Sequence, residues 1–243
     1  MTIPRIFVPT KLQINQKIEL DPTASHHLLQ VLRLQPQNQL LVFNNAGGEF
    51  KARLIAINKH QAVVILEEFI TDDKESPLSI HLGQGISRGE KMDFTIQKAV
   101  ELGANIITPL FTTYCNVKLD AERLGKRIHH WQGVAISATE QSGRCYVPQI
   151  MPAQNLLKWA SIPVLEELRL VFAPNAKNKL SDLKEKPKKI TILVGPEGGL
   201  SEEEISSAKQ NNFLPVTLGP RILRTETAAL AAISILQSMW GDY

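Results

Sequence analysis

Two stretches near the end of the chain decide its fold: Lys189-Ile-Thr-Ile-Leu-Val-Gly-Pro-Glu-Gly-Gly-Leu-Ser201 and Pro215-Val-Thr-Leu-Gly-Pro-Arg-Ile-Leu-Arg-Thr225. Each starts with an apolar run, passes through a Gly-Pro loop and continues into sequence typical of a helix. The runs are short and contain β-branched residues, which predicts strands buried on both faces of a parallel sheet. Ligands on such sheets bind at the carboxyl ends of the strands, so both loops are candidate binding sites.

The residues around the first loop indicate which ligand charge it favours. Neither loop has the G-x-G-x-x-G or G-x-x-x-x-G-K-[ST] spacing of a phosphate-binding loop. Ser201 and Glu204 predict a capping box, and the run from Glu202 places three carboxylates at the positive end of a helix dipole. These carboxylates would repel a phosphate, which favours a neutral or cationic ligand held by backbone that glycines leave accessible. Two ordinary strand-to-helix turns are the alternative, but the repetition, with Arg221 and Arg224 in the second loop, favours a site.

The same residues resemble a known family. The two C-terminal motifs of the SPOUT-class RNA methyltransferases are similar to Gly195-Pro-Glu-Gly-Gly-Leu-Ser201 and Leu218-Gly-Pro-Arg-Ile-Leu-Arg-Thr-Glu-Thr-Ala228. Within that class, the chain resembles the ribosomal RNA small subunit methyltransferase E subfamily. The resemblance implies an α/β fold with a trefoil-knotted parallel-sheet domain, which binds S-adenosylmethionine in the knot and works as a homodimer. General folding rules predict an unknotted chain, so the knot is an expectation from the resemblance alone.

Composition is that of a globular protein. The chain has 243 residues, of which 43% are hydrophobic and 21% charged, with a net charge of +3. That charge is weak for a protein that grips nucleic acid by charge alone. We expect no transmembrane helix, no signal peptide and no metal site, and a cytoplasmic location with Cys115 and Cys145 reduced. The pairs His26-His27 and His129-His130 are adjacent on predicted helices, where they point apart and cannot chelate one metal well.

A small β-rich domain is expected over residues 1–72. Strands are predicted at 39–43, 49–57 and 61–66, joined by turns of hairpin chemistry, with helical spacing between Thr23 and Leu34. Short strands with tight turns suggest a small barrel. The domain also resembles a PUA-like RNA-binding β-barrel, on the strength of two segments: Pro4-Arg-Ile-Phe7 and His27-Leu-Leu-Gln-Val-Leu-Arg33.

The polar segment Thr71-Asp-Asp-Lys-Glu-Ser-Pro77 is the predicted boundary, and residues 77–243 form the predicted methyltransferase domain. Strand and helix patterns alternate through it, which is the α/β signature. Gly83-Gln-Gly-Ile-Ser-Arg-Gly89 is close to a dinucleotide-binding fingerprint, but Arg88 stands where the third glycine belongs. No acidic residue follows on the strand over 106–111, so we reject a dinucleotide-binding fold.

The resemblance implies a pocket for S-adenosylmethionine where the two loops meet the end of the strand before Ala173. Its sulfonium cation suits a loop that contains Glu197, and aliphatic loop residues suit its adenine. The expected cofactor-binding residues are Ala173, Pro174, Val194, Gly195, Pro196, Glu197, Gly198, Leu218, Gly219, Leu223 and Thr225.

The resemblance also implies a reaction, methylation of N3 of a uridine in 16S rRNA of the small ribosomal subunit. Uracil N3 carries a proton and is a poor nucleophile until that proton leaves, so cations near the carbonyl oxygens would stabilise the resulting anion. Arg221 and Arg224 are the candidates, with Glu197 as a further catalytic candidate. Arg5 lies in an apolar segment and should reach an acidic neighbour or a partner, so it could also arrive at the site. The general base stays open between Glu197, Glu226 and water.

Basic residues elsewhere are candidate contacts to the RNA backbone. They are Arg5, Arg33, Lys118, Arg123, Arg127 and Arg144. For those near the start of the helix predicted over 120–142, a solvated face is the alternative. Two other function classes stay open, a non-catalytic RNA-binding ribosome-assembly factor of the same fold and an α/β enzyme that binds a neutral small molecule.

Overall fold

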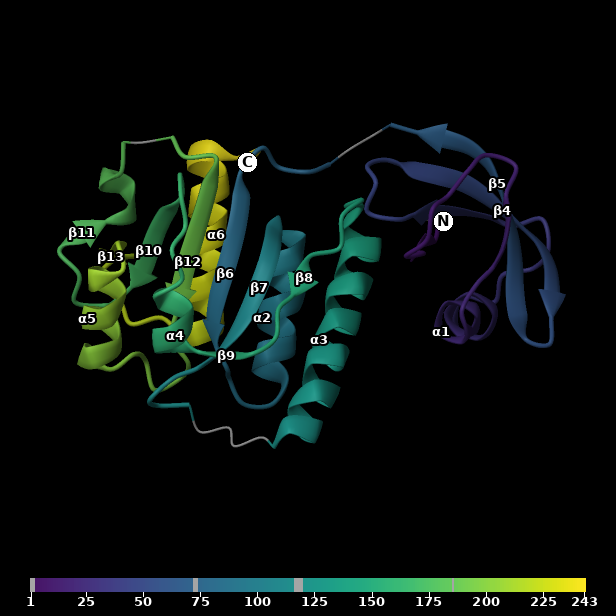
Figure 1. Ribbon diagram of the computed structural model, residues 1–243. Coiled ribbons are helices and arrows are strands. Elements are labelled where there is room, and N and C mark those ends of the chain that lie inside the picture. Colours follow the sequence, from purple (N-terminus) through teal and green to yellow (C-terminus); the bar gives the residue numbers. More distant parts are fainter. Residues whose placement is uncertain (1–2, 72–73, 116–119, 185) are drawn as a thin grey trace. The chain divides into compact units, whose positions relative to one another are not determined.

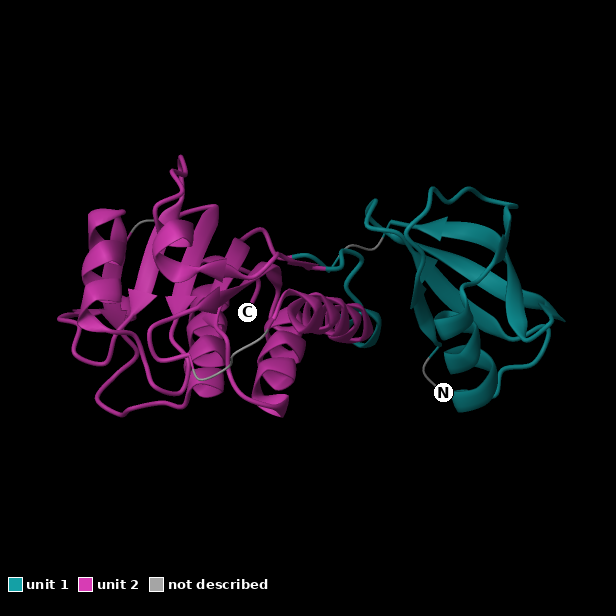
Figure 2. Cartoon of the chain, turned by 60° about the horizontal axis from the view of Figure 1, so that its bottom comes forward, with its two compact units in different colours: residues 1–75, 139–147 teal, residues 76–138, 148–243 magenta. Residues whose placement is uncertain are grey.

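A computed structural model of the chain describes residues 3–71, 74–115, 120–184 and 186–243. The chain forms two compact units (Figure 2). The N-terminal unit contains residues 1–75 and 139–147, and the C-terminal unit contains residues 76–138 and 148–243. None of the helices described is both long and apolar enough to cross a membrane.

The N-terminal unit is built on a five-stranded sheet with the order β1-β3-β4-β5-β2. Strands β1 and β3 are parallel and the other neighbours are antiparallel. The expected short strands are confirmed. The bounds are β1 Arg5–Phe7, β2 Lys17–Glu19, β3 Gln39–Phe43, β4 Glu49–Asn58 and β5 Gln61–Ile70.

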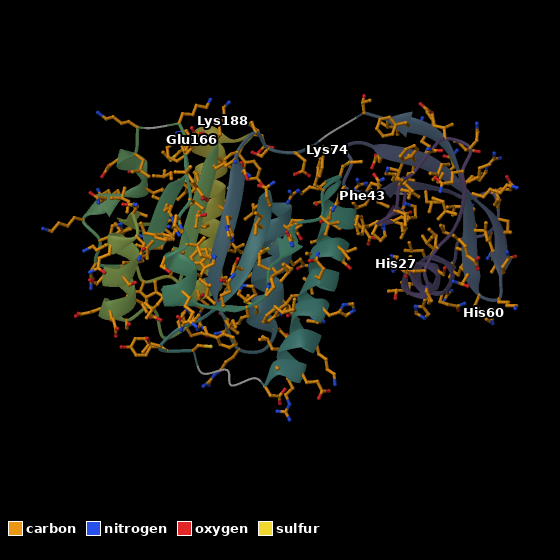
Figure 3. The ribbon with its side chains drawn as sticks, in the orientation of Figure 1. His27, Phe43, His60, Lys74, Glu166 and Lys188 are labelled. Atoms are coloured by element: carbon orange, nitrogen blue, oxygen red, sulfur yellow. The ribbon has the colours of Figure 1, made fainter. Side chains whose placement is uncertain are left out.

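A short helical segment covers the interior of this sheet. Helix α1 (Pro22–His26) starts at Asp21, whose carboxylate accepts hydrogen bonds from the N–H groups of its first turn. It continues as the π-helical turn η1 (His27–Val31), so the helix ends three residues before the expected limit at Leu34. Leu28 is buried in the core with Leu40, Leu54 and Val64. The β4–β5 hairpin turns at Lys59 and His60, both with positive φ, and His60 lies at its tip (Figure 3).

The C-terminal unit contains an eight-stranded sheet whose seven-strand path has the order β11-β13-β10-β12-β6-β7-β8, with β9 paired to β7. The pairings along it are all parallel. This confirms the predicted parallel α/β architecture. The bounds are β6 Ser79–Gly85, β7 Ala104–Phe111, β8 Gln149–Ile150, β9 Gln154–Asn155, β10 Leu168–Phe172, β11 Asn178–Lys179, β12 Lys189–Val194 and β13 Phe213–Thr217.

Helices cover both faces of this sheet. Figure 1 shows α2 and α6 side by side on one face and α4 and α5 on the other. Their bounds, with those of α3 and the 3-10 turn η2, are α2 Glu90–Glu101, α3 Ala121–Ser142, α4 Leu156–Ala160, η2 Leu180–Asp182, α5 Glu202–Gln210 and α6 Thr225–Trp240. Because both faces are covered, β12 is buried from Ile190 to Val194, as its apolar run predicts. The trefoil knot stays a prediction.

The segment Thr139–Val147, which includes the last turn of α3, belongs to the N-terminal unit. The expected domain of residues 77–243 does not anticipate this. The physical reason is Arg5, whose guanidinium donates to the carbonyl oxygens of Thr139, Glu140 and Arg144 at 2.9–3.1 Å. Backbone carbonyl oxygens in and just after the last turn of a helix are not all used by the helix itself, so the buried arginine that donates to them holds the segment in place.

Candidate active site

The C-terminal unit has a cavity of about 660 Å³ at the carboxyl ends of three neighbouring strands. Strands β10, β12 and β13 lead into it, and the first turn of α6 closes one side. Small-molecule sites in open parallel sheets are found at this edge. The lining residues are Lys91, Phe172, Ala173, Pro174, Val194, Gly195, Pro196, Glu197, Gly198, Gly199, Leu200, Ile205, Val216, Thr217, Leu218, Arg221, Ile222, Leu223, Arg224, Thr225 and Ala228.

The first Gly-Pro loop follows β12 and doubles back on itself. A Cβ atom added at Gly195 would lie 2.9 Å from the carbonyl carbon of Gly199, so the loop has no room for a side chain there. At Gly198 an added Cβ would lie 2.7 Å from the Cβ atom of Tyr114. The expectation that these glycines serve ligand access is therefore incomplete, because both are needed for the packing of the chain itself. The predicted capping box of α5 is confirmed, with Ser201 and Glu204 each accepting the other's backbone N–H.

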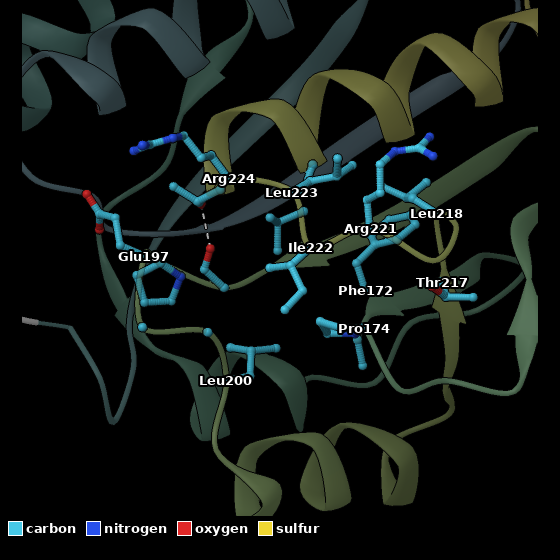
Figure 4. Close-up of a pocket in the computed structure, with 18 of the residues that line it drawn as sticks. Phe172, Pro174, Glu197, Leu200, Thr217, Leu218, Arg221, Ile222, Leu223 and Arg224 are labelled. Carbon is cyan, nitrogen blue, oxygen red and sulfur yellow. Dashed lines mark hydrogen bonds between the residues drawn. The ribbon is translucent and has the colours of Figure 1, made fainter.

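The second Gly-Pro loop follows β13 and carries the two arginines. Both guanidinium groups are exposed, and neither makes a hydrogen bond or ion pair with the residues that the structure describes. Ile222 lies between them and is 86% exposed although it lines the cavity. Figure 4 shows the apolar side chains of Pro174, Leu200 and Ile222 around the cavity and the arginine side chains directed away from one another. The site thus combines an apolar interior with a cationic rim whose two arginines pair with none of the described residues.

Glu197 is the carboxylate of the cavity lining. Its Oε1 atom lies 3.3 Å from Nζ of Lys91 and accepts a hydrogen bond of 3.2 Å from the backbone N–H of Arg88. Burial alone would raise the pKa of Glu197, but hydrogen bonds from its own backbone and from Arg88, together with Lys91, outweigh burial and lower it. Glu197 is therefore ionised at neutral pH.

Every residue expected around a cofactor lines this cavity except Gly219, which has φ +127° in the loop beside it. Arg221, Arg224 and Glu197, three of the expected catalytic residues, are brought together with them. Sequence reasoning missed Lys91 as a member of the site. The available signal was the segment from Gly83 to Gly89, which spans the end of β6 and leads to Lys91, because the carboxyl ends of parallel strands lie at the same edge of the sheet.

Arg5 and Arg144 are placed in the interior of the N-terminal unit, whereas the cavity residues belong to the C-terminal unit. The side chain of Arg5 is 10% exposed and pairs with Glu49 at 2.7 Å, which is the acidic neighbour that its sequence context predicts. Arg144 is 4% exposed and pairs with Glu75 at 2.6 Å. Both guanidinium groups are engaged inside the unit, and this arrangement indicates a structural role.

The other basic candidates lie on the surface. Arg33 and Arg127 are exposed, and Arg33 has a φ of 55° just after the π-helical turn. Arg123 is exposed and lies 3.4 Å from Asp120. Lys118 lies outside the described residues. Within the described ranges, no group of three or more His, Cys, Asp and Glu side chains could hold a metal ion.

Comparisons with known proteins agree with this architecture. Residues 74–237 match a family described as an RNA methyltransferase domain, and residues 20–67 match an RNA methyltransferase PUA domain. The ribosomal RNA small subunit methyltransferase E of Buchnera aphidicola (strain Sg) is 43% identical over 99% of this chain and 98% of its own length. The protein of that name from Bacillus subtilis is 32% identical, over 91% of this chain and 92% of its own.

A crystal structure extends this likeness to the whole fold. The ribosomal RNA small subunit methyltransferase E of Neisseria gonorrhoeae, solved with S-adenosyl methionine bound, superposes with a TM-score of 0.93 at 41% identity. The match covers 100% of both chains. From its sequence, its parallel sheet and its PUA domain, the chain belongs to the ribosomal RNA small subunit methyltransferase E family.

Proposed function

We propose that this chain transfers a methyl group from S-adenosylmethionine to N3 of a uridine in the 16S rRNA of the small ribosomal subunit, in the cytoplasm. The observation that carries the proposal is the cavity between the two Gly-Pro loops, which has an apolar interior and, on its rim, two arginines that pair with none of the described residues. A methyl donor in the cavity and an RNA base at the rim would then meet between the loops.

The lining fits the donor in size and chemistry. A volume of about 660 Å³ is within the range of small-molecule sites, and aliphatic residues such as Leu218 and Leu223 suit an uncharged heterocycle. Glu197 supplies a negative charge near the rim, and Lys91 only partly offsets it because water screens this half-exposed pair. When bound, the donor supplies an electrophilic methyl group on a sulfonium. The two loops would hold it in line with the acceptor, and such positioning accelerates displacement reactions.

Arg221 and Arg224 would act on the acceptor. Their guanidinium groups are exposed and unpaired within the described part of the chain, so they are available to a ligand that enters from solvent. Uracil that has lost its N3 proton carries its negative charge on two carbonyl oxygens, and each guanidinium can donate hydrogen bonds to one of them. The arginines would thereby lower the pKa of N3 and favour the nucleophilic anion.

The proton itself would leave to water. Glu197 has a lowered pKa, which makes it a weak base, and its carboxylate already accepts hydrogen bonds. Glu226 is not among the cavity-lining residues described. An exposed rim whose arginines pair with none of the described residues favours direct loss of the proton to solvent, and the reaction should accelerate as pH rises.

The N-terminal unit would bind RNA, in keeping with its PUA match, and two copies of the chain would act together. Support for a homodimer comes from α6, where Ala228, Ala231 and Ile235 form an apolar stripe that is only partly covered. Small residues on such a stripe let a second backbone approach closely. Analytical ultracentrifugation at micromolar concentration should give twice the mass of one chain, and a single-chain mass would contradict the dimer.

One assay tests the reaction. Purified chain is incubated with radiolabelled S-adenosylmethionine and small ribosomal subunits from a bacterium that lacks the enzyme, and the labelled nucleotide is identified by digestion and mass spectrometry. We expect 3-methyluridine at one position in 16S rRNA. Label on another atom or on another RNA would contradict the proposed acceptor. Binding to subunits without any label would favour a non-catalytic assembly factor of the same fold.

A further inference from the structure

A buried glutamine that does not line the cavity connects the two loops that form it. Gln84 is the second-last residue of β6, pairs in register with Val194 at the end of β12, and is 0% exposed. The next residue, Gly85, packs directly under the first loop, since an added Cβ would lie 2.5 Å from the nitrogen of Pro196. The end of β6 is therefore in direct contact with the first loop.

The glutamine reaches the second loop through one hydroxyl group. Its Nε2 atom donates to Oγ1 of Thr225 at 2.9 Å, and that hydroxyl donates to the carbonyl oxygen of Gly195 at 2.6 Å. Gly195 opens the first loop, whereas Thr225 begins α6 at the end of the second loop. A single chain of hydrogen bonds thus joins both loops to the centre of the sheet.

The direction of these bonds is fixed by proton count. A threonine hydroxyl has one proton, which is used on Gly195, so the hydroxyl must accept from an N–H of Gln84. The other amide proton is donated to the carbonyl oxygen of Gly85 at 3.0 Å. The Oε1 atom of Gln84 is then left buried without a hydrogen-bond partner in the described structure. The side-chain amide is therefore oriented by the hydrogen bonds that its nitrogen donates to Thr225 and Gly85, and not by a bond to its own oxygen.

We propose that Gln84 is a positioning residue for cofactor binding, which holds Gly195 and the first turn of α6 at the separation that forms the cavity. The inference rests on the proposed function, because the cavity must bind S-adenosylmethionine for its geometry to matter. Gln84 touches no ligand and acts through Thr225.

The test compares two buried glutamines. Gln84→Met removes the amide donor at similar size, and we expect S-adenosylmethionine to bind about tenfold more weakly in calorimetry, as loss of about 1.4 kcal/mol requires. Gln237→Met is the matched control. Gln237 is 1% exposed and hydrogen-bonds to Ser76 and Leu102. It lies twelve residues after Thr225 on α6, which places it on the order of 18 Å from Thr225. We expect this control to lower the thermal unfolding midpoint and to leave the affinity within about twofold.

A second pair of variants, at Thr225, tests the same hydrogen bonds without any change at Gln84. Thr225→Val removes the hydroxyl at nearly constant size and should weaken S-adenosylmethionine binding as much as Gln84→Met does. Thr225→Ser keeps the hydroxyl, so its affinity for S-adenosylmethionine should be near that of the wild type. Wild-type affinity in Gln84→Met or in Thr225→Val would overturn the inference, and so would an equal loss in Gln237→Met. If the wild-type chain itself bound no S-adenosylmethionine, the proposed function would fail before any variant is compared.

Discussion

Nζ of Lys91, on the first turn of α2, lies 3.3 Å from Oε1 of Glu197, in the first Gly-Pro loop. The two residues are more than a hundred positions apart, and the pairing of β6 with β12 brings their loops together. The backbone N–H of Arg88 donates to the same carboxylate oxygen. Glu197 is thereby held as an anion at one side of the cavity, and its charge is available to a cationic ligand.

We predict that Glu197 recognises the sulfonium charge of the donor. Glu197→Gln keeps the size of the side chain and removes its charge, so S-adenosylmethionine should bind about two- to fivefold more weakly, as the loss of one partly exposed ion pair implies. S-adenosylhomocysteine has nearly the same shape without the positive charge, and its affinity should be unchanged. Calorimetry with both ligands measures the ratio. An equal loss for the two ligands would show that Glu197 acts on loop structure and not on charge.

We predict that Arg221 stabilises the anionic acceptor. Arg221→Ala should lower kcat for methylation of small subunits by about 10²-fold, the usual effect of removing one donor to a developing oxyanion. The Kd for S-adenosylmethionine should stay near its wild-type value, because the apolar lining is intact. Lys158→Ala, which removes an exposed cation on α4 away from the cavity, is the control for net charge. Undiminished methyl transfer by Arg221→Ala would exclude the role.

Much of the C-terminal unit could be predicted because its signals are local. Helix α6 (Thr225–Trp240) follows the second Gly-Pro loop, as the sequence predicts, because small apolar residues typical of a packed helix follow the loop. The capping box at Ser201 needs only four consecutive residues. Strand β12 is recognised from its own apolar run. Such features depend on neighbours in sequence, so a single chain reveals them.

The remaining features depend on residues that are distant in sequence. Lys91 joins the cavity only because β6 pairs with β12, and no local pattern gives that register. Gly85 resembles a binding-loop glycine, yet its position is required by Pro196, which packs against it. Similarly, Thr139–Val147 joins the N-terminal unit through Arg5, more than a hundred residues earlier. Sequence patterns identify the loops of the site but not the contacts that hold them.

We predict that His81 makes the C-terminal unit sensitive to acid. Burial, and secondarily the charge of Arg169, lower the pKa of His81 from 6.5 to about 4. Between these values the unfolded chain binds a proton that the folded chain does not, so the free energy of unfolding falls as pH decreases from about 6.5 to about 4, by up to about 3 kcal/mol. Above about pH 6.5 this contribution is constant.

Urea unfolding followed by tryptophan fluorescence measures this effect, because Trp131, Trp159 and Trp240 all lie in the C-terminal unit. His81→Gln should flatten the pH dependence between pH 4 and 6.5, although it loses packing against Trp159. His60→Gln, at the exposed hairpin tip of the N-terminal unit, should leave the dependence as in wild type. An unchanged slope in His81→Gln would assign the acid sensitivity to other groups.

We predict that Arg5 stabilises the N-terminal unit and does not take part in methyl transfer. Arg5→Met removes the ion pair with Glu49 and the hydrogen bonds that Arg5 donates to the carbonyl oxygens of Thr139, Glu140 and Arg144. Loss of one partner from a buried ion pair destabilises a protein by about 3–5 kcal/mol. Hydrogen exchange should therefore accelerate in β1 and β3 of this variant, and the affinity for S-adenosylmethionine in the C-terminal unit should be unchanged.

Two further variants separate stability from chemistry. Arg33→Met removes an exposed arginine of the same unit and should leave hydrogen exchange as in wild type. The double variant Arg5→Met with Glu49→Met should recover part of the lost protection, because a buried charge without its partner costs more than the absence of both charges. Among these variants, the rate of methylation should rise and fall with the protection of β1 and β3 from hydrogen exchange, since RNA binding needs a folded N-terminal unit. If Arg5→Met exchanged like wild type and still lost methyl transfer, Arg5 would belong to the reaction, and its buried pair with Glu49 would have to open during turnover.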